Sequence, residues 1–307
     1  MPLKQLKRFI YLKPIDFIGF VCLAALFFFL VACSSKTVSS RDKLSEPAEG
    51  AGSNLDATEN QQLQARELKD ELAIGREMAA KLYGTFGSFG SSDKEDSKNP
   101  LKYINLVGKS LAYQSGRPEL VFRFGILETQ DINAFAAPGG YILVTRGVLK
   151  LAKNESELAG VLAHEIAHVS HKHMYKDIAP KRSVTAGESV TRFLSGGKSD
   201  IGGALTKAVS EGMKKLLEEG LSPEKEFEAD ATALSLVLTM GYNPWDYIRF
   251  LERLEKTVAK AEVTKTHPSF KDRIEKAKRF SAENGIKDQM AANKVQLEKR
   301  FTESMIK

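Results

Sequence analysis

The spacing of apolar and polar residues in the first half of the chain predicts helices together with a small amount of sheet. Across residues 61–83, apolar residues recur every three or four positions, which is typical of an amphipathic helix. The same spacing returns at 101–113, after a loop rich in Gly and Ser. Two apolar runs, at 120–128 and 141–149, then predict extended strands.

A tight turn lies between these two runs. Pro138, Gly139 and Gly140 follow the segment INAFAA and allow the chain to reverse its direction. The turn therefore predicts that residues 132–136 and 140–145 form adjacent strands.

The second half of the chain is helical in pattern. Asn154 is followed by Glu157 at the spacing of a capping box, and apolar residues continue at helical spacing after it. Ser222 and Pro223 mark another helix start, because proline is favoured at the first helical position. We expect the other helices at about 205–219, 223–240, 244–260, 268–282 and 288–305. The whole pattern predicts a predominantly α-helical α+β fold.

The length of the chain fits one substantial domain better than two. We expect a domain at residues 61–285 and a C-terminal helix at 286–307. Residues 176–204 lose helical periodicity and are rich in Gly, so we expect a mobile segment there that could cover a cleft as a lid.

The N-terminus has the layout of a secretory signal. Basic residues precede an apolar run at 15–32, and LVAC at 30–33 is similar to the bacterial lipobox. We expect residues 1–32 to be a lipoprotein signal peptide, Cys33 to carry the lipid, and 33–60 to be a flexible tether. A retained membrane anchor is the alternative, because the apolar run is just long enough to cross a bilayer. By resemblance, Ser34 favours the outer membrane.

Composition narrows the chemistry of the chain after the signal. Four basic residues and one acidic residue lie in the first 32, so the net charge of the rest is +3 instead of +6. This weak charge carries no nucleic-acid-binding signature, and we expect no nucleic-acid partner. Cys22 lies in the signal and Cys33 is assigned to lipid. Catalysis must therefore come from His, carboxylates or hydroxyls.

The segment VLAHEIAHVSHKH, at 161–173, holds four of the five histidines. His164 and His168 are four residues apart, so on a helix they share a face with their Cβ atoms about 5–6 Å apart. Both can then bind one Zn²⁺ ion at roughly 2.0–2.1 Å. Glu165 lies one step round the helix, where a carboxylate can take a proton from a water at the metal.

A catalytic zinc site typically has a third protein ligand. The metzincin pattern is excluded, because His171 stands where that pattern has Gly and Met174 stands where it has His. The later segment SPEKEFEADATAL offers Glu226 and Asp230, which are four residues apart and share a helix face. A solvated acidic helix start is the alternative interpretation of this segment.

Four motifs in order make the pattern specific. NAFAAPGGYILV, HEIAH, EFEAD and THPSFKDRI, within about residues 65–280, resemble the gluzincin metallopeptidase family of the CAAX prenyl protease and HtpX. The resemblance implies a zincin-like fold with a small sheet beside the HEIAH helix. It implies one Zn²⁺ per chain with His164, His168 and Glu226 as ligands, Glu165 as general base, and Asp230 as a carboxylate that supports a ligand.

The same resemblance gives roles to further residues. It makes the hairpin part of the substrate cleft, where an extended peptide could add to a strand edge; the residues are Asn133, Ala134, Phe135 and Ala136. It places His267 near the metal, as a catalytic or plugging residue or a helix-cap histidine. Arg273 would pair with active-site carboxylates or form a structural ion pair. We expect His171 to be a polar surface residue or a supporting residue, and His173 to be structural.

These expectations combine into a functional hypothesis. The chain would be a zinc-dependent metalloendopeptidase, anchored by lipid in the bacterial cell envelope at the periplasmic face of the outer membrane. It would hydrolyse peptide bonds in unfolded or misassembled envelope proteins, with the outer-membrane assembly machinery as a candidate partner. The alternative is a periplasmic holdase or assembly factor that acts mainly by binding.

Overall fold

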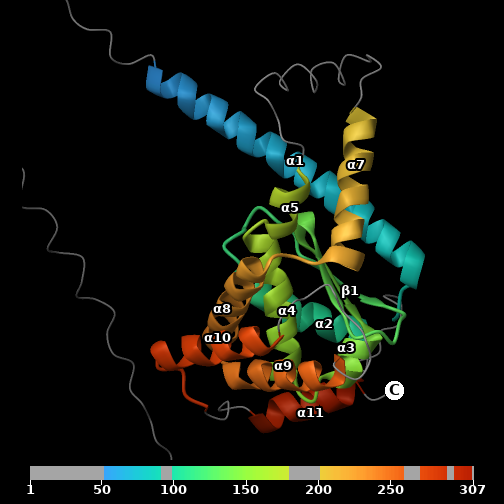
Figure 1. The fold of residues 1–307 in the computed structure, drawn as a ribbon, viewed down its shortest axis with the longest axis vertical. Coiled ribbons are helices and arrows are strands. Elements are labelled where there is room, and N and C mark those ends of the chain that lie inside the picture. The colour runs from blue at the N-terminus through green and yellow to red at the C-terminus, as the bar shows by residue number, and fades with distance from the viewer. Residues whose placement is uncertain (1–51, 91–98, 180–200, 259–269, 289–293, 306–307) are drawn as a thin grey trace, which may run out of the picture. The chain divides into compact units, whose positions relative to one another are not determined.

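A computed structural model describes residues 52–90, 99–179, 201–258, 270–288 and 294–305. These residues form a small sheet surrounded by helices (Figure 1). In chain order the elements are α1 (Gly52–Phe86), α2 (Pro100–Ala112), β1 (Arg123–Leu127), β2 (Ala134–Ala137), η1 (Pro138–Gly140), β3 (Tyr141–Thr145), α3 (Arg146–Leu151), α4 (Glu155–Ser170), α5 (His173–Ile178), α7 (Ile201–Lys214), η3 (Lys215–Glu219), α8 (Pro223–Thr239), α9 (Pro244–Val258), α10 (Phe270–Glu283) and α11 (Lys294–Met305). The predominantly helical α+β class is confirmed.

The three strands pair in the order β1-β3-β2. The expected hairpin is present, since β2 and β3 are antiparallel, with Ala134 opposite Val144. Gly139 and Gly140 turn the chain with φ values of 73° and 91°, which glycine adopts without strain. β1 lies parallel to β3 on its other side. Within the described residues β2 therefore pairs with β3 alone and lies at the edge of the sheet.

The strands are shorter than the apolar runs that predict them. The run at 141–149 changes to helix after Thr145, because the hydroxyl of Thr145 accepts a hydrogen bond from the backbone N–H of Val148 and caps α3. The prediction of extended structure at 146–149 is thus wrong, because these residues belong to α3. An apolar run of this length does not distinguish a strand from a buried helix turn.

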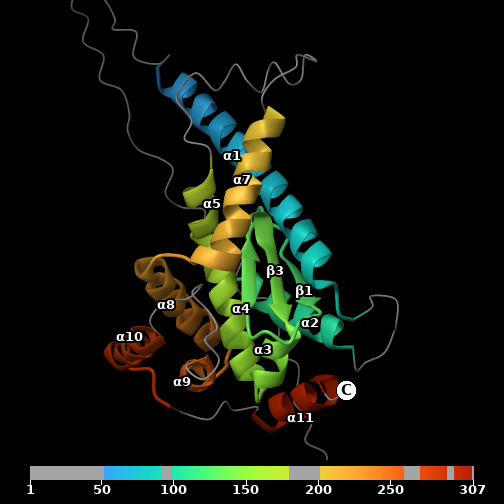
Figure 2. The same cartoon turned by 45° about the vertical axis from the view of Figure 1, so that its right-hand side comes forward.

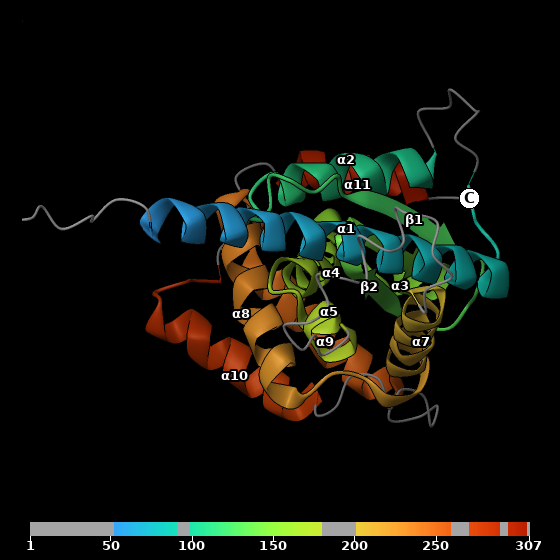
Figure 3. The same ribbon diagram turned by 90° about the horizontal axis from the view of Figure 1, so that it is seen from above.

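Alternating side chains of the sheet face two different layers. Ile142 and Val144 join the core that α2 and α4 contribute to, whereas Leu143 packs with Ala79 and Leu82 of α1. Helix α1 therefore runs along one face of the sheet (Figure 3). The opposite face of the sheet packs against α2 and α4.

Helix α4 lies between the sheet and the pair α8 and α9 (Figure 2). Its residues are buried from Glu155 through Val169. The Asn154 carboxamide oxygen accepts from the N–H of Glu157 at 2.9 Å, and the Glu157 carboxylate accepts from the N–H of Lys153 at 2.7 Å. This cap begins the helix at the predicted residue. Gly160 lets α9 approach closely, since a Cβ there would lie 2.5 Å from Cβ of Tyr247.

Helix α1 begins earlier than expected. Apolar spacing predicts a start near 61, but α1 begins at Gly52, so the last part of the expected tether is helical. Periodicity marks only the part of a helix that packs on a core, and here the side chains at 59–65 are exposed while burial begins at Glu71. The polar first turns of α1 therefore carry no apolar signal.

Several expectations fall outside the described residues. They concern the signal at 1–32, Cys33, residues 33–51 of the tether, residues 180–200 of the expected lid, and His267. Among the helices that the structure describes, none combines the length and apolar character needed to span a membrane.

Candidate metal centre

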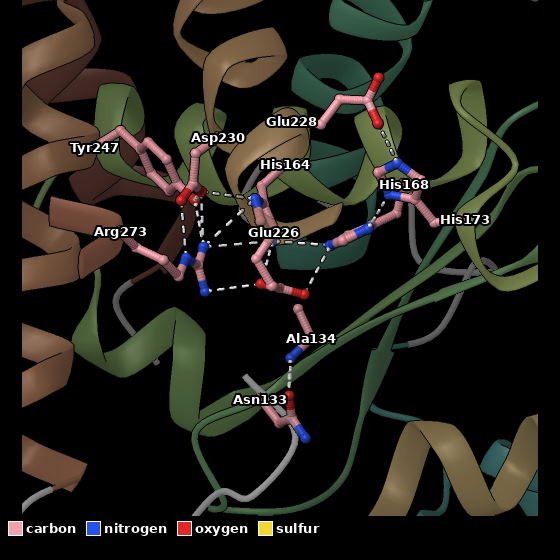
Figure 4. A network of polar contacts seen from close by, with 10 residues as sticks. All are labelled: Asn133, Ala134, His164, His168, His173, Glu226, Glu228, Asp230, Tyr247 and Arg273. Carbon is pink, nitrogen blue, oxygen red and sulfur yellow. Dashed lines mark hydrogen bonds and ion pairs between the residues drawn. The ribbon is translucent and has the colours of Figure 1, made fainter. Parts of the chain in front are cut away.

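Three helices bring a buried cluster of charged and imidazole side chains together (Figure 4). Helix α4 contributes His164 and His168, and α8 contributes Glu226 and Asp230. Arg273 enters from α10. Each of these side chains is at most 5% exposed, so the cluster lies inside the protein.

His164, His168 and Glu226 have the geometry of a set of metal ligands. The Nε2 atoms of His164 and His168 are 3.0 Å apart, and each lies 3.5 Å from an oxygen of Glu226. Ligand atoms around a tetrahedral zinc, with bonds of roughly 2.0–2.1 Å, are about 3.3 Å apart. Two imidazoles and one carboxylate are also donors that suit Zn²⁺. The cluster could therefore hold a metal ion.

Asp230 supports one imidazole of this cluster. Its Oδ1 lies 3.0 Å from Nδ1 of His164 and accepts a hydrogen bond of 2.8 Å from the hydroxyl of Tyr247. Burial alone would raise the pKa of Asp230, but the charge and hydrogen bonds of Arg273 outweigh it and hold the pKa well below its usual value. Asp230 is therefore a carboxylate that can accept the Nδ1–H of His164.

The metal-free imidazole of His164 is basic. Burial and the charge of Arg273 disfavour its protonation, yet hydrogen bonds to Asp230 and Glu226 raise its pKa to about 9. A metal ion that binds the imidazole of His164 therefore competes with a proton.

Arg273 binds the two carboxylates that α8 contributes to the cluster, those of Glu226 and Asp230. Its Nη1 lies 3.0 Å from Oε2 of Glu226, and its Nε and Nη2 donate to Asp230 at 2.8 and 2.7 Å. The expected pairing of Arg273 with carboxylates at the site is thus present. Its charge offsets the burial of two acidic groups.

Glu165 lies between two hollows of the surface. One is lined by His164, Glu165 and Asn133 together with apolar residues of α4, α9 and α10. The other is lined by Glu165 and His168 together with Ala134, Phe135 and Ala136 of β2. Glu165 itself is 3% exposed. The structure thus brings the edge strand β2 next to the cluster, and its role in substrate binding stays a prediction.

The part of the chain that carries this cluster matches a known protein family. Residues 99–281 match the family model described as Peptidase family M48. The chain belongs to peptidase family M48. It is a metallopeptidase, and the resemblance noted in the sequence is confirmed.

Named relatives of this M48 chain are proteases. The beta-barrel assembly-enhancing protease of Escherichia coli K12 is 27% identical over 217 residues, which are 67% of this chain and 44% of the relative. The mitochondrial metalloendopeptidase OMA1 of Schizosaccharomyces pombe is 33% identical over 60% of this chain and 54% of the relative. Metalloprotease YcaL of Escherichia coli K12 is 25% identical over 60% and 68%. The chain spans about half the length of the first two.

Part of the surroundings of the buried cluster has no signal in the sequence. Tyr247 carries no motif and reaches Asp230 only because α9 packs against α4. His173 is expected to be structural; its Nδ1 lies 2.8 Å from Nδ1 of His168, and its Nε2 lies 3.0 Å from Oε2 of Glu228. The signal for Glu228 was its position in the EFEAD motif, two residues after Glu226.

Proposed function

We propose that the chain is a zinc-dependent endopeptidase in which His164, His168 and Glu226 hold one zinc ion. The observation that carries the proposal is the buried His-His-Glu cluster. Glu165 of α4 lies beside this cluster and shares a hollow with the edge strand β2. When bound, a zinc ion supplies a positive charge that polarises a peptide carbonyl and makes a water more acidic. The remaining chemistry belongs to residues of this chain.

Glu165 is the proposed general base. It accepts a proton from the attacking water and returns it to the amine that leaves. Two neighbours hold the ligand imidazoles so that each Nε2 faces Glu226: Asp230 binds Nδ1 of His164, and His173 binds Nδ1 of His168. Such partners fix the tautomer and the orientation of a ligand histidine.

The hollows beside Glu165 support an extended peptide as the substrate. An edge strand offers backbone groups to which a peptide can add as a further strand. The hollow that contains Glu165 and His164 is otherwise lined mainly by apolar side chains, including Val161, Phe250 and Phe270. We propose that it receives a large apolar side chain next to the scissile bond. Unfolded proteins expose such side chains, which folded proteins bury.

The N-terminal sequence and the relatives support a location in the bacterial cell envelope. We propose that the chain is anchored by lipid at Cys33 in the bacterial envelope and acts on unfolded or misassembled envelope proteins. The lipobox-like LVAC supports the anchor, and the name of the beta-barrel assembly-enhancing protease supports a role near outer-membrane assembly.

The substitution Glu165→Gln tests proteolysis as the main function against a holdase that only binds. The amide cannot accept a proton but keeps the size of the side chain. We expect the variant to keep its zinc, to lose cleavage of an unfolded protein, and to fail to rescue the envelope defect of a deletion strain. Full rescue by a zinc-loaded, inactive variant would overturn the proposal in favour of binding.

A further inference from the structure

We propose that His171, His173 and Glu228 form a second site for a divalent transition-metal ion such as Zn²⁺ or Co²⁺. One nitrogen of each histidine and the Glu228 carboxylate lie within 4.8 Å of one another. Nδ1 of His171 is 3.4 Å from Oε1 of Glu228, and Nε2 of His173 is 3.0 Å from Oε2. Each nitrogen thus lies near one of the two Glu228 oxygens at about the 3.3 Å spacing between ligand atoms of a four-coordinate ion.

The backbone aims both imidazoles at the same carboxylate. Lys172, between them, has a left-handed φ of 56°, which turns the chain between α4 and α5. The rings of His171 and His173 then stack with an interplanar angle of 15°. His171 also caps the C-terminus of α4, where the helix dipole favours a cation.

The other nitrogen of each imidazole is already held. Nε2 of His171 lies 2.9 Å from the hydroxyl of Thr232, and Nδ1 of His173 lies 2.8 Å from Nδ1 of His168. Metal-binding histidines almost always have such a partner at the nitrogen that does not bind the metal. These contacts fix the orientation of both rings before an ion arrives. For His173 they suit a metal at Nε2 only while Nδ1 of His168 acts as the acceptor.

The second site is accessible from solvent, unlike the first. The side chain of Glu228 is 55% exposed and that of His171 is 32% exposed, whereas His173 is 2% exposed. An ion can enter over Glu228 and His171 and keep water as its remaining ligands. Such a site binds more weakly than a fully buried one, and it responds to metal that is present in excess.

The two sites share one hydrogen bond. When Nε2 of His168 binds a metal, its Nδ1 carries a hydrogen and donates it to Nδ1 of His173. When His173 binds a metal through Nε2, its own Nδ1 carries a hydrogen, and two N–H groups then face each other across 2.8 Å. Filling the second site therefore removes the partner of His168, and loss of such a partner typically costs about 10–100-fold in metal affinity.

This coupling rests on the proposed zinc site, but the second site itself does not. The experiment is a titration of metal-free full-length protein with Co²⁺, followed by visible absorption and by bound metal per chain. We expect two equivalents in the wild type. His171→Gln and Glu228→Gln each lose the weaker equivalent and keep the tighter one. Glu224→Gln, an exposed residue of the same helix, is the matched control and keeps both.

The variant His164→Ala separates the two proposals. It removes the tighter equivalent and leaves the weaker one, which the double variant His164→Ala with His171→Gln then loses. A wild type that binds one equivalent, or a second equivalent that survives both His171→Gln and Glu228→Gln, would overturn the second site. A tight equivalent that survives His164→Ala would instead overturn the proposed zinc site.

Peptidase activity at increasing Zn²⁺ tests the coupling. We expect the wild type to lose activity as the second equivalent binds, and His171→Gln to resist at the same concentration. Equal inhibition of both proteins would show that the inhibition does not come from this site.

Discussion

Asp230 contacts the nitrogen of His164 that faces away from Glu226. Its Oδ1 lies 3.0 Å from Nδ1 of the imidazole, whereas Glu226 lies on the Nε2 side (Figure 4). This contact predicts the effect of Asp230→Asn. The amide can present an N–H to Nδ1, which favours the wrong tautomer for metal binding at Nε2. We expect zinc affinity to fall by about 10–100-fold, as measured by competition with a chelator. Asp246→Asn, in a surface ion pair with Arg249, is the control and should leave the affinity unchanged. Equal affinities of all three proteins would contradict the role of Asp230.

Arg273 predicts a stability effect that depends on metal. Replacing it with Met leaves Glu226 and Asp230 buried without their cation. We expect the metal-free variant to lose about 3–5 kcal/mol of unfolding free energy, measured by urea denaturation. A bound zinc ion restores positive charge near Glu226, so added zinc should recover part of the loss.

The comparison for Arg273→Met is Arg249→Met, because the side chain of Arg249 is 41% exposed, so that solvent reaches its ion pairs. We expect that control to cost less than about 1 kcal/mol. A similar cost for the two arginine variants, with or without zinc, would show that the buried charges do not govern stability here.

Gly160 couples helix packing to the site. A Cβ at this position would lie 2.5 Å from Cβ of Tyr247, whose hydroxyl donates to Asp230. We expect Gly160→Ala to push α9 away, to cost about 1–3 kcal/mol of stability, and to weaken zinc binding. Thermal unfolding and a chelator competition measure the two effects.

Gly84 in α1 is the matched control for Gly160, because a Cβ there would meet nothing within 4 Å. Gly84→Ala should be neutral or stabilising, by up to about 1 kcal/mol. If both alanine variants behave alike, the close approach of α4 and α9 does not matter for the site.

The apolar hollow beside Glu165 predicts cleavage specificity. Leu254 lines its wall, so Leu254→Trp should narrow it and shift cleavage from large towards small apolar residues. Mass spectrometry of the products of an unfolded protein reads this shift directly. Leu238→Trp, at an exposed position on α8, should leave the pattern as in the wild type. An unchanged pattern in Leu254→Trp would remove this hollow from the substrate site.

The parts of the site that the sequence could predict are those with local spacing. The helical period places His164, Glu165 and His168 next to one another on α4. It places Glu226 and Asp230 on one face of α8 in the same way, so spacing in the sequence predicts spacing in the structure. Tyr247 and Gly160 matter only through the packing of α9 against α4, which no local pattern records.

The same limit applies to the ends of elements. The start of α4 can be predicted from Asn154, because its side-chain oxygen accepts a hydrogen bond from the backbone N–H of Glu157. The change from β3 to α3 depends on one hydroxyl, that of Thr145, inside an apolar run. The polar start of α1 has no apolar period at all, so its first residue could not be found from spacing.

The proposed peptidase activity requires His164, His168 and Glu226 to hold one catalytic metal ion. Its most direct test is the metal content of purified wild type and His168→Ala after gel filtration in metal-free buffer, together with cleavage of an unfolded protein. We expect about one zinc per wild-type chain, cleavage that a chelator abolishes and zinc restores, and neither zinc nor cleavage in His168→Ala. Cleavage that persists in chelator, or a His168→Ala variant with as much tightly bound zinc as the wild type, would contradict it.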